Sequence, residues 1–379
     1  MPLTGVTVME QRLAFVLRAS AEGANIRALC REVGISPDTA YRLLEAYRAH
    51  GVDGLVHRSR RPATTPSQTS PEIEARVLAV RAAHPTWGGR KIHAWLRDQA
   101  GLAQPPAPST ITGILRRHGL LRGPRAGGPR AFQRFERAAP NELWQMDFIG
   151  HRPLTAGGRV HPLTLLDDHS RFLLALVACA HERGDGVQEI LIACFRIFGL
   201  PHAILADNGP AWGSSHHGSF NRLEAWLLRI GVPVMHGRPL HPQTQGKVER
   251  SNQTIGQDIV AEWGPLVDLA HAQLTFDRFR TCYNTERPHE ALGMQVPATR
   301  YVASARPSPE TLPDLVYPAG DVVCSVHQHG AIWFHKRKLQ ISEALSGLDV
   351  GIRPTETDGV FQVYYCARQM AIIDLREET

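Results

Sequence analysis

Residues 143–148 read Leu-Trp-Gln-Met-Asp-Phe, a strand-like run that is apolar apart from Gln145 and Asp147. An ionised carboxylate in such a strand is costly unless a cation or a hydrogen-bond donor compensates it. Asp147 is therefore the first candidate functional residue.

The sequence around this run predicts a mixed α/β domain. Further strand signals are aliphatic and β-branched runs, and they alternate with helical patterns before two long helical segments. The expected strands are 143–148, 160–166, 172–177, 203–206 and 232–235, and the expected helices are 187–198, 220–230, 244–262 and 266–283.

Two more carboxylates stand at positions that favour a site. Asp207 directly follows the short strand 203–206 and precedes Asn-Gly-Pro, so it is expected at the carboxyl edge of a sheet beside a tight turn. Glu249 lies near the start of the long polar helix expected at 244–262 and shares a helical face with Gln245 and Asn252. Carboxylate oxygens favour Mg²⁺ or Mn²⁺, and two such ions suit phosphoryl transfer. The alternative is that Asp147 and Glu249 pair with nearby arginines and Asp207 is only a turn residue.

The positive charge of the chain is concentrated in its first third. Residues 1–139 hold 21 Lys and Arg against 10 Asp and Glu, a net +11, whereas the remainder carries −5. This asymmetry favours a basic arm that binds a polyanion, with nucleic acid as the leading partner class.

A helix-turn-helix pattern lies at the start of this basic third. Three short amphipathic helices are expected up to residue 49, with Leu13, Val16 and Leu17 as the apolar residues of the first, and Gly34-Ile35-Ser36-Pro37 forms the turn before the third. The third helix would present Thr39, Tyr41 and Arg42 to a DNA major groove. A plain three-helix bundle is the alternative.

The pattern repeats once after a basic linker. A second helical unit is expected at 71–121, with a helix opening near Arg90 and Lys91 and a third helix that turns Arg116 and Arg117 outward. Residues 122–137, with Arg122 and Arg125 among five arginines, are too poor in apolar periodicity to pack a core. They would either lie along DNA phosphates or form a solvated linker.

The last part of the chain returns to short strands. Apolar residues alternate between 322 and 365, and Thr357-Asp358-Gly359 is typical of a hairpin turn. We expect a small β-barrel with a basic loop at 335–338. Its role would be DNA contact, subunit contact or both.

Several classes of site and location are disfavoured. No apolar run approaches the roughly 20 residues of a membrane span, and the first residues do not resemble a secretory signal, so a cytosolic location is expected. The six cysteines are widely spread and are expected to be reduced and mostly buried. His216, His217, His236 and His241 fit no zinc-ligand spacing and are expected to be surface or hydrogen-bonded residues.

The order and context of these motifs resemble the DDE integrase core of bacterial insertion-sequence transposases. The resemblance covers nearly the whole chain, including the paired helix-turn-helix units and the carboxyl-terminal strands. It rests on residues 144–148, Leu166-Asp167-Asp168-His169-Ser170-Arg171, Asp207-Asn208-Gly209, 243–252, and Tyr283-Asn284 followed by Arg287-Pro288-His289.

The resemblance implies an RNase H-like core with five strands in mixed order. Asp147, Asp207 and Glu249 would then be the catalytic metal ligands, holding two Mg²⁺ or Mn²⁺ ions. The 41 residues between Asp207 and Glu249 exceed the family's common spacing, and we attribute the excess to the loop 212–218. Asp167 and Asp168 are expected to form a structural turn, because consecutive strand residues point to opposite faces.

The implied function is that of a DNA transposase. It would bind terminal inverted repeats, expose 3′ hydroxyls by cleavage and join them to target DNA. The expected partners are double-stranded DNA and at least one further copy of the chain, and no membrane partner is expected. Lys247 and Arg250 would hold DNA phosphates near the metals or simply be solvated. A regulator with an inactive integrase-like body is the alternative, and a general RNase H-type nuclease is disfavoured by the two helix-turn-helix units.

The expected organisation is multidomain α+β. Its boundaries are helix-turn-helix 1–57, linker 58–70, second helix-turn-helix 71–121, Arg-rich linker 122–139, RNase H-like core 140–304 and β-barrel 305–379.

Overall fold

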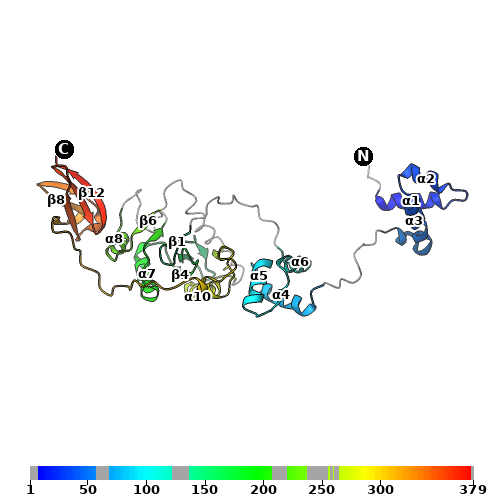
Figure 1. The fold of residues 1–379 in the computed structure, drawn as a ribbon, viewed down its shortest axis with the longest axis horizontal. Helices are drawn as coiled ribbons and strands as arrows, with labels where there is room; N and C mark the ends of the chain where they lie inside the picture. Colours follow the sequence, from blue (N-terminus) through cyan, green and yellow to red (C-terminus); the bar gives the residue numbers. More distant parts are fainter. Residues whose placement is uncertain are drawn as a thin grey trace. The chain divides into compact units, whose positions relative to one another are not determined.

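The computed structural model describes residues 7–56, 68–121, 136–206, 220–236, 255–256, 259 and 264–376. The chain divides into two compact units, residues 1–68 and 69–379, and each is considered by itself (Figure 1).

The first unit is a three-helix domain with the predicted turn. Its helices are α1 (Val8–Ala19), α2 (Ile26–Val33) and α3 (Pro37–His50), followed by the 3₁₀ turn η1 (Gly51–Leu55). α2 ends at Gly34, whose φ of 73° lies in the left-handed region that favours glycine. The Ser36 side chain accepts a hydrogen bond from the Thr39 N–H, and Pro37 occupies the first helical turn. The turn predicted from Gly34-Ile35-Ser36-Pro37 is confirmed.

One core residue of this domain differs from the sequence expectation. Phe15 and Val16 are buried, whereas Leu17 is 54% exposed. Leu17 lies on the other side of α1 because the helix turns by about 100° at each residue, so Val16 and Leu17 cannot both face the core fully.

A second three-helix module begins the other unit. It comprises α4 (Pro71–Ala83), α5 (Gly89–Asp98) and α6 (Pro108–Arg117). Trp87, Ile92, Ile111, Ile114 and Leu115 are fully buried and form its centre, so α6 turns its apolar residues inward. α5 starts against α6 so closely that a Cβ at Gly89 would collide with the Pro108 carbonyl.

The central domain is built on a mixed sheet. Its strands are β1 (Trp144–Phe148), β2 (Arg152–Pro153), β3 (Arg159–Asp167), β4 (Leu173–Cys179), β5 (Ile204–Ala206) and β6 (Val234–His236). β1 pairs antiparallel with β3 and parallel with β5, β5 pairs parallel with β6, and β4 pairs with β3 on the far side. Apart from the two-residue β2, the sheet is the predicted set of five strands in mixed order.

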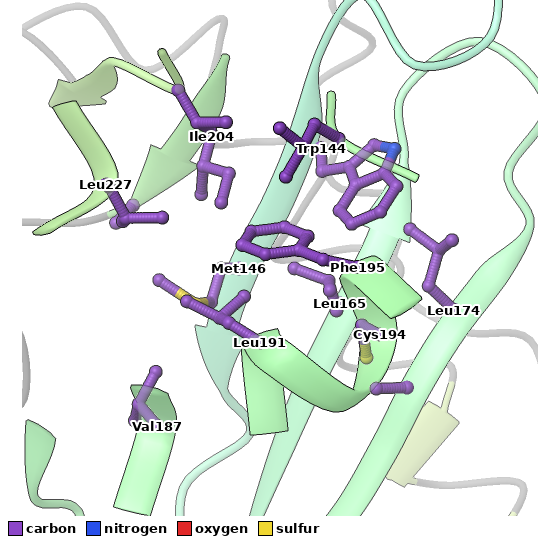
Figure 2. Close-up of a cluster of buried hydrophobic side chains, with 14 of the residues drawn as sticks. Trp144, Met146, Leu165, Leu174, Val187, Leu191, Cys194, Phe195, Ile204 and Leu227 are labelled. Atoms are coloured by element: carbon purple, nitrogen blue, oxygen red, sulfur yellow. The ribbon is translucent and has the colours of Figure 1, made fainter. Parts of the chain in front are cut away.

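Helices cover both faces of this sheet. On one face, α7 (Gly184–Phe198) and α8 (Arg222–Arg229) pack on inward-pointing residues of the strands. Figure 2 shows Leu191 and Phe195 of α7 against Trp144 and Met146 of β1. On the other face, α10 (Leu269–Thr285) buries Phe276 together with strand residues and Ile255. Since side chains alternate along a strand, Gln145 and Asp147 point toward the face that α10 covers.

Polar side chains of α10 cover the edge of β4. Gln273 donates to Leu176 O and accepts from Ala178 N, and Arg280 donates to Leu174 O. The amide of Asn284 accepts from Leu173 N and donates to Leu173 O. The helix therefore satisfies main-chain groups that an edge strand would otherwise leave unpaired.

The carboxyl-terminal domain consists of a four-stranded sheet and a hairpin. The sheet has the order β12-β11-β10-β7, and β8 and β9 form a separate two-stranded hairpin. The bounds are β7 (Val322–Ser325), β8 (Ala331–Phe334), β9 (Arg337–Gln340), β10 (Asp349–Pro354), β11 (Val360–Tyr365) and β12 (Arg368–Asp374). The hairpin turn predicted at 357–359 joins β10 to β11, with Gly359 at a φ of 78°.

The predicted β-barrel is not confirmed, because the strand pairings across residues 264–376 do not close into a ring. Ile332 and Phe334 of the hairpin instead pack on Val350, Ile352 and Val363 of the sheet through one apolar core. Hydrophobic packing thus holds the hairpin where a barrel would require main-chain hydrogen bonds.

The structure also shows the state of the cysteines and the lengths of the described helices. All six cysteines are free thiols, but only Cys30 and Cys194 are buried and the other four are half-buried, so the expectation that most are buried was wrong. Among the residues described, no helix has the length and apolarity needed to cross a membrane.

Candidate active site

Asp147 lies near the end of the central strand of the mixed sheet. Trp144, Gln145 and Met146 are buried, whereas Asp147 is half-buried. Thr164 lies opposite on β3, and its hydroxyl donates to the main-chain oxygen of Asp147 at 2.9 Å. The main chain at Asp147 is therefore held from β3, and its carboxylate projects from a rigid element, as a preorganised site requires.

The strand that precedes Asp207 runs beside β1. β5 pairs in parallel with β1 through Trp144–Ile204, Gln145–Leu205 and Met146–Ala206. β5 ends at Ala206. Asp207 itself, with the predicted loop 212–218, lies outside the described residues.

Glu249, the third candidate carboxylate, also lies outside the described residues. Farther along the chain, residues 255, 256 and 259 are helical. Gly256 lies against the segment that follows Asp147, because a Cβ at this position would meet Arg152 Nη2 at 2.8 Å and Ile149 Cγ2 at 3.6 Å. Ile255 and Ile259 are buried against the α10 side of the sheet.

Asp167 and Asp168 form the structural turn predicted for them. Both are fully buried. Asp167 accepts hydrogen bonds from Asn141 N at 2.7 Å and from the N–H and hydroxyl of Ser170. Burial raises the pKa of Asp167, although these hydrogen bonds act in the opposite direction.

Asp168 serves a separate set of partners. Its carboxylate accepts from Gln145 Nε2 at 2.6 Å and from Arg137 N at 2.8 Å, and it lies 3.5 Å from the buried guanidinium of Arg171. The two aspartates therefore hold the end of β3 and do not share one site.

Gln145 is a residue near the site that the sequence interpretation missed. It lies two positions before Asp147, and its side chain is 97% buried, with a relative exposure of 3%. Its amide nitrogen is bound to Asp168, while its Oε1 has no hydrogen-bond partner in the described part of the chain. The signal that could have identified it is its polarity in an otherwise apolar strand, the same signal that identified Asp147.

The first helix-turn-helix domain exposes part of its predicted DNA-contact set. Tyr41 is 55% exposed, and the Arg42 side chain is 70% exposed and lies 3.9 Å from the Asp38 carboxylate. Thr39 is half-buried, and its hydroxyl is 2.9 Å from the Ser36 hydroxyl. Thr39 therefore also takes part in the cap of α3, which reduces its freedom to contact DNA.

The predicted contacts of the second module are less uniform. Arg116 is exposed at the end of α6, but Arg117 donates to Glu74 at 2.9 Å. Arg90 is exposed and lies 3.5 Å from Glu290, and Lys91 is half-buried. The remaining predicted contacts lie outside the described residues: Arg122, Arg125, Lys247 and Arg250.

Of the four histidines considered for zinc, the structure describes His236. His236 is hydrogen-bonded to the buried Glu224 at 2.5 Å, as expected of a residue with a structural partner. His216, His217 and His241 lie outside the described residues.

Several domain families match the chain. Two families described as Integrase core domain match residues 137–242 and 230–297, which together contain Asp147, Asp207 and Glu249. A Helix-turn-helix domain family matches residues 11–63 and a Homeodomain-like domain family matches residues 39–115. The family described as IS481 family transposase, C-terminal domain, matches residues 321–379.

Two relatives come from bacterial insertion elements. An uncharacterized protein of insertion element IS407 from Burkholderia multivorans is 27% identical over 276 residues, which cover 72% of this chain and 92% of that protein. One from insertion element IS476 of Xanthomonas euvesicatoria is 27% identical over 268 residues, 69% of this chain and 74% of that protein. Among solved structures, the HTLV-2 integrase catalytic core domain in complex with magnesium matches 43% of this chain and 97% of that chain, with 16% identity and a TM-score of 0.34.

Proposed function

Since the chain belongs to the bacterial insertion-sequence transposases of the DDE integrase superfamily, we propose that it cleaves the ends of its element and joins them to target DNA. Cleavage would expose a 3′ hydroxyl at each element end, and that hydroxyl would attack a phosphodiester of the target. Helix-turn-helix domains and an integrase core in one chain support DNA transposition as its general function.

The register between β1 and β5 carries this proposal. It ends at the pair Met146–Ala206, and the residue that follows each of these two in the sequence is a candidate carboxylate, Asp147 or Asp207. Neighbouring strands lie about 4.8 Å apart and consecutive Cα atoms about 3.8 Å apart. These values limit the Cα separation of the two aspartates to about 12 Å, within which two side chains can share metal ions.

Helical spacing supports Glu249 as the third member of the site. Glu249 precedes Gly256 by seven positions, two helical turns, so a helix that continued back from Gly256 would carry both residues on one face. A Cβ at Gly256 would meet Ile149 and Arg152, which follow Asp147 in the chain, and this closeness supports the proposal that Glu249 belongs to the same site.

The donor set of this site fits hard divalent cations. Three carboxylates supply only oxygen ligands, which suits Mg²⁺ or Mn²⁺. When bound, two such ions would activate the attacking water or 3′ hydroxyl and stabilise the leaving oxygen. Asp147 would contribute a ligand from a rigid strand, and Lys247 and Arg250 would contact DNA phosphates beside Glu249.

The other parts of the chain would position DNA for this chemistry. Domains 1–57 and 71–121 would bind the terminal inverted repeats through Tyr41, Arg42 and Arg116, with the basic linker 122–139 along the phosphates. The core would span 140–304 and the carboxyl-terminal domain 305–379, the latter in contact with DNA or with another subunit. Joining two element ends requires at least a dimer, which we place in the bacterial cytosol at the nucleoid.

The test separates catalysis from DNA binding. We expect D147N, D207N and E249Q to retain affinity for an inverted-repeat duplex in a gel-shift assay and to lose Mg²⁺-dependent cleavage by at least about 100-fold. D277N, which alters an exposed carboxylate of α10, serves as the matched control and should cleave normally. Cleavage that persists in a triad variant removes that residue from the site, and a wild type that binds the ends without cutting them would indicate an inactive regulator.

A further inference from the structure

A second cluster of metal-ligating side chains lies away from the candidate active site. One ligand atom from each of His84, Cys282 and Glu286 can be chosen so that all three lie within 4.8 Å of one another. His84 follows the last residue of α4, whereas Cys282 lies in the last turn of α10 and Glu286 caps that helix. The cluster therefore joins the second three-helix module to the central domain.

Two of the three side chains, His84 and Cys282, are held in place by packing. The His84 ring stacks on Trp87, with centroids 3.8 Å apart and planes within 7°. Trp87 is fully buried in the centre of the module, and Cys282 packs against the same apolar cluster. Cys282 and Glu286 are four positions apart, so they share one helix face, and Glu286 N donates to Cys282 O at 2.9 Å.

The combination of ligands selects the metal. A thiolate and an imidazole beside one carboxylate disfavour Mg²⁺ and Ca²⁺, which prefer oxygen, and suit Zn²⁺. Zinc bond lengths of about 2.0 to 2.3 Å place tetrahedral donors about 3.5 Å apart, so closure of the cluster needs only side-chain adjustments of about 1 Å. We propose that His84, Cys282 and Glu286 bind one Zn²⁺, with a water molecule in the fourth position.

Bound zinc would fix the second module against the central domain. Two other polar contacts lie in the same region: Arg90 is 3.5 Å from Glu290, and Gln99 donates to Thr285 O at 3.4 Å. Both are exposed and contribute little alone, because water competes for them. A metal with ligands from both elements would add a rigid link to these contacts. This role does not depend on the carboxylates of the proposed active site.

Cobalt provides a direct probe, because Co²⁺ takes the ligands of Zn²⁺ and a cobalt–thiolate bond absorbs in the near ultraviolet. We expect the full chain to bind one equivalent of Co²⁺ with this absorption band, and Zn²⁺ to abolish the band by displacement. C282S should lose the band, and H84Q and E286Q should bind at least about 100-fold more weakly.

Matched variants locate the signal. C324S replaces another half-buried cysteine and should keep the band, as should D147N, which alters only the candidate active site. A C282S protein that keeps the band, or a wild type that shows none, would overturn the proposal. The zinc ligands and Asp147 belong to separate sites. The cobalt band therefore tests the zinc proposal whether or not the transposase proposal holds.

Discussion

Replacing Asn284 with alanine should detach the start of β4 from α10. Asn284 is 94% buried, with a relative exposure of 6%, and both ends of its amide bind the main chain of Leu173, at 2.8 Å to the N–H and 3.0 Å to the oxygen. Alanine removes both partners at once. Leu173 is fully buried, so water cannot readily replace them.

The expected cost follows from these two groups. A buried polar group left without its partner costs about 1 to 3 kcal/mol, so N284A should lower the free energy of unfolding of the central domain by about 2 to 6 kcal/mol. Domains are typically stable by only about 5 to 15 kcal/mol, so this loss would be a large fraction of the total.

Hydrogen exchange and urea unfolding measure the effect. In N284A, the Leu173 amide should exchange faster, and the unfolding transition of the central domain should move to lower urea. T281A is the matched control, since Thr281 is exposed on the same helix and its hydroxyl donates to the carbonyl of Asp277 within that helix. T281A should change stability by no more than about 0.5 kcal/mol. If N284A behaves like T281A and Leu173 stays protected, the edge-covering role of α10 is wrong.

Three further predictions concern the turn, a buried carboxylate and DNA contacts. S36A removes the cap of α3 and should cost about 1 kcal/mol of stability, with faster amide exchange in the first turn of that helix; unchanged exchange would contradict the capping role. The pKa of Asp167 is raised in the folded protein above its ordinary value of 3.8. Between these two pKa values the folded protein holds a proton that the unfolded chain has released. The contribution of Asp167 to stability is therefore lost as pH rises from 3.8 through the raised pKa. D167N should lack that slope when urea unfolding is measured from acid to neutral pH, and an identical slope in both proteins would refute the assignment. R42A and R116A should each weaken end binding and reduce the salt slope by about one, whereas R97A, whose guanidinium is bound to its neighbouring aspartate, should leave both unchanged; equal salt slopes in all three variants would remove Arg42 and Arg116 from the interface.

Local chemistry explains why much of the fold was predictable. The turn at Gly34-Ile35-Ser36-Pro37 depends on residues that favour one conformation each, and the structure has that turn. β1 and β5 are short apolar runs with sharp boundaries, and both occur as expected within one or two residues.

Features that depend on tertiary packing were missed or misjudged. β12 (Arg368–Asp374) carries a Met-Ala-Ile-Ile run without clear alternation, and its pairing with β11 determines its conformation. The predicted barrel is not confirmed, because alternation predicts strands but does not predict which strand edges will pair.

The candidate sites also differ in whether local sequence or tertiary packing reveals them. Asp147 could be identified from its own strand, because a carboxylate among apolar residues is conspicuous in the sequence. The cluster of His84, Cys282 and Glu286 could not, because its ligands come from two distant segments and its spacing matches no short motif. The assignments of Asp207 and Glu249 to the site stay predictions. The end of β5 at Ala206 supports Asp207, and the closeness of Gly256 to Ile149 and Arg152 supports Glu249.

Iron-directed cleavage of the protein backbone tests most directly whether three distant carboxylates share one metal site. Fe²⁺ would replace Mg²⁺ in the DNA-bound full chain, and hydroxyl radicals generated with ascorbate and peroxide would cut the backbone next to the metal. We expect cuts near residues 147, 207 and 249 together, competed by Mg²⁺ and absent from D147N. Cuts near only one of these positions, or a cutting pattern that D147N leaves unchanged, would contradict a shared site.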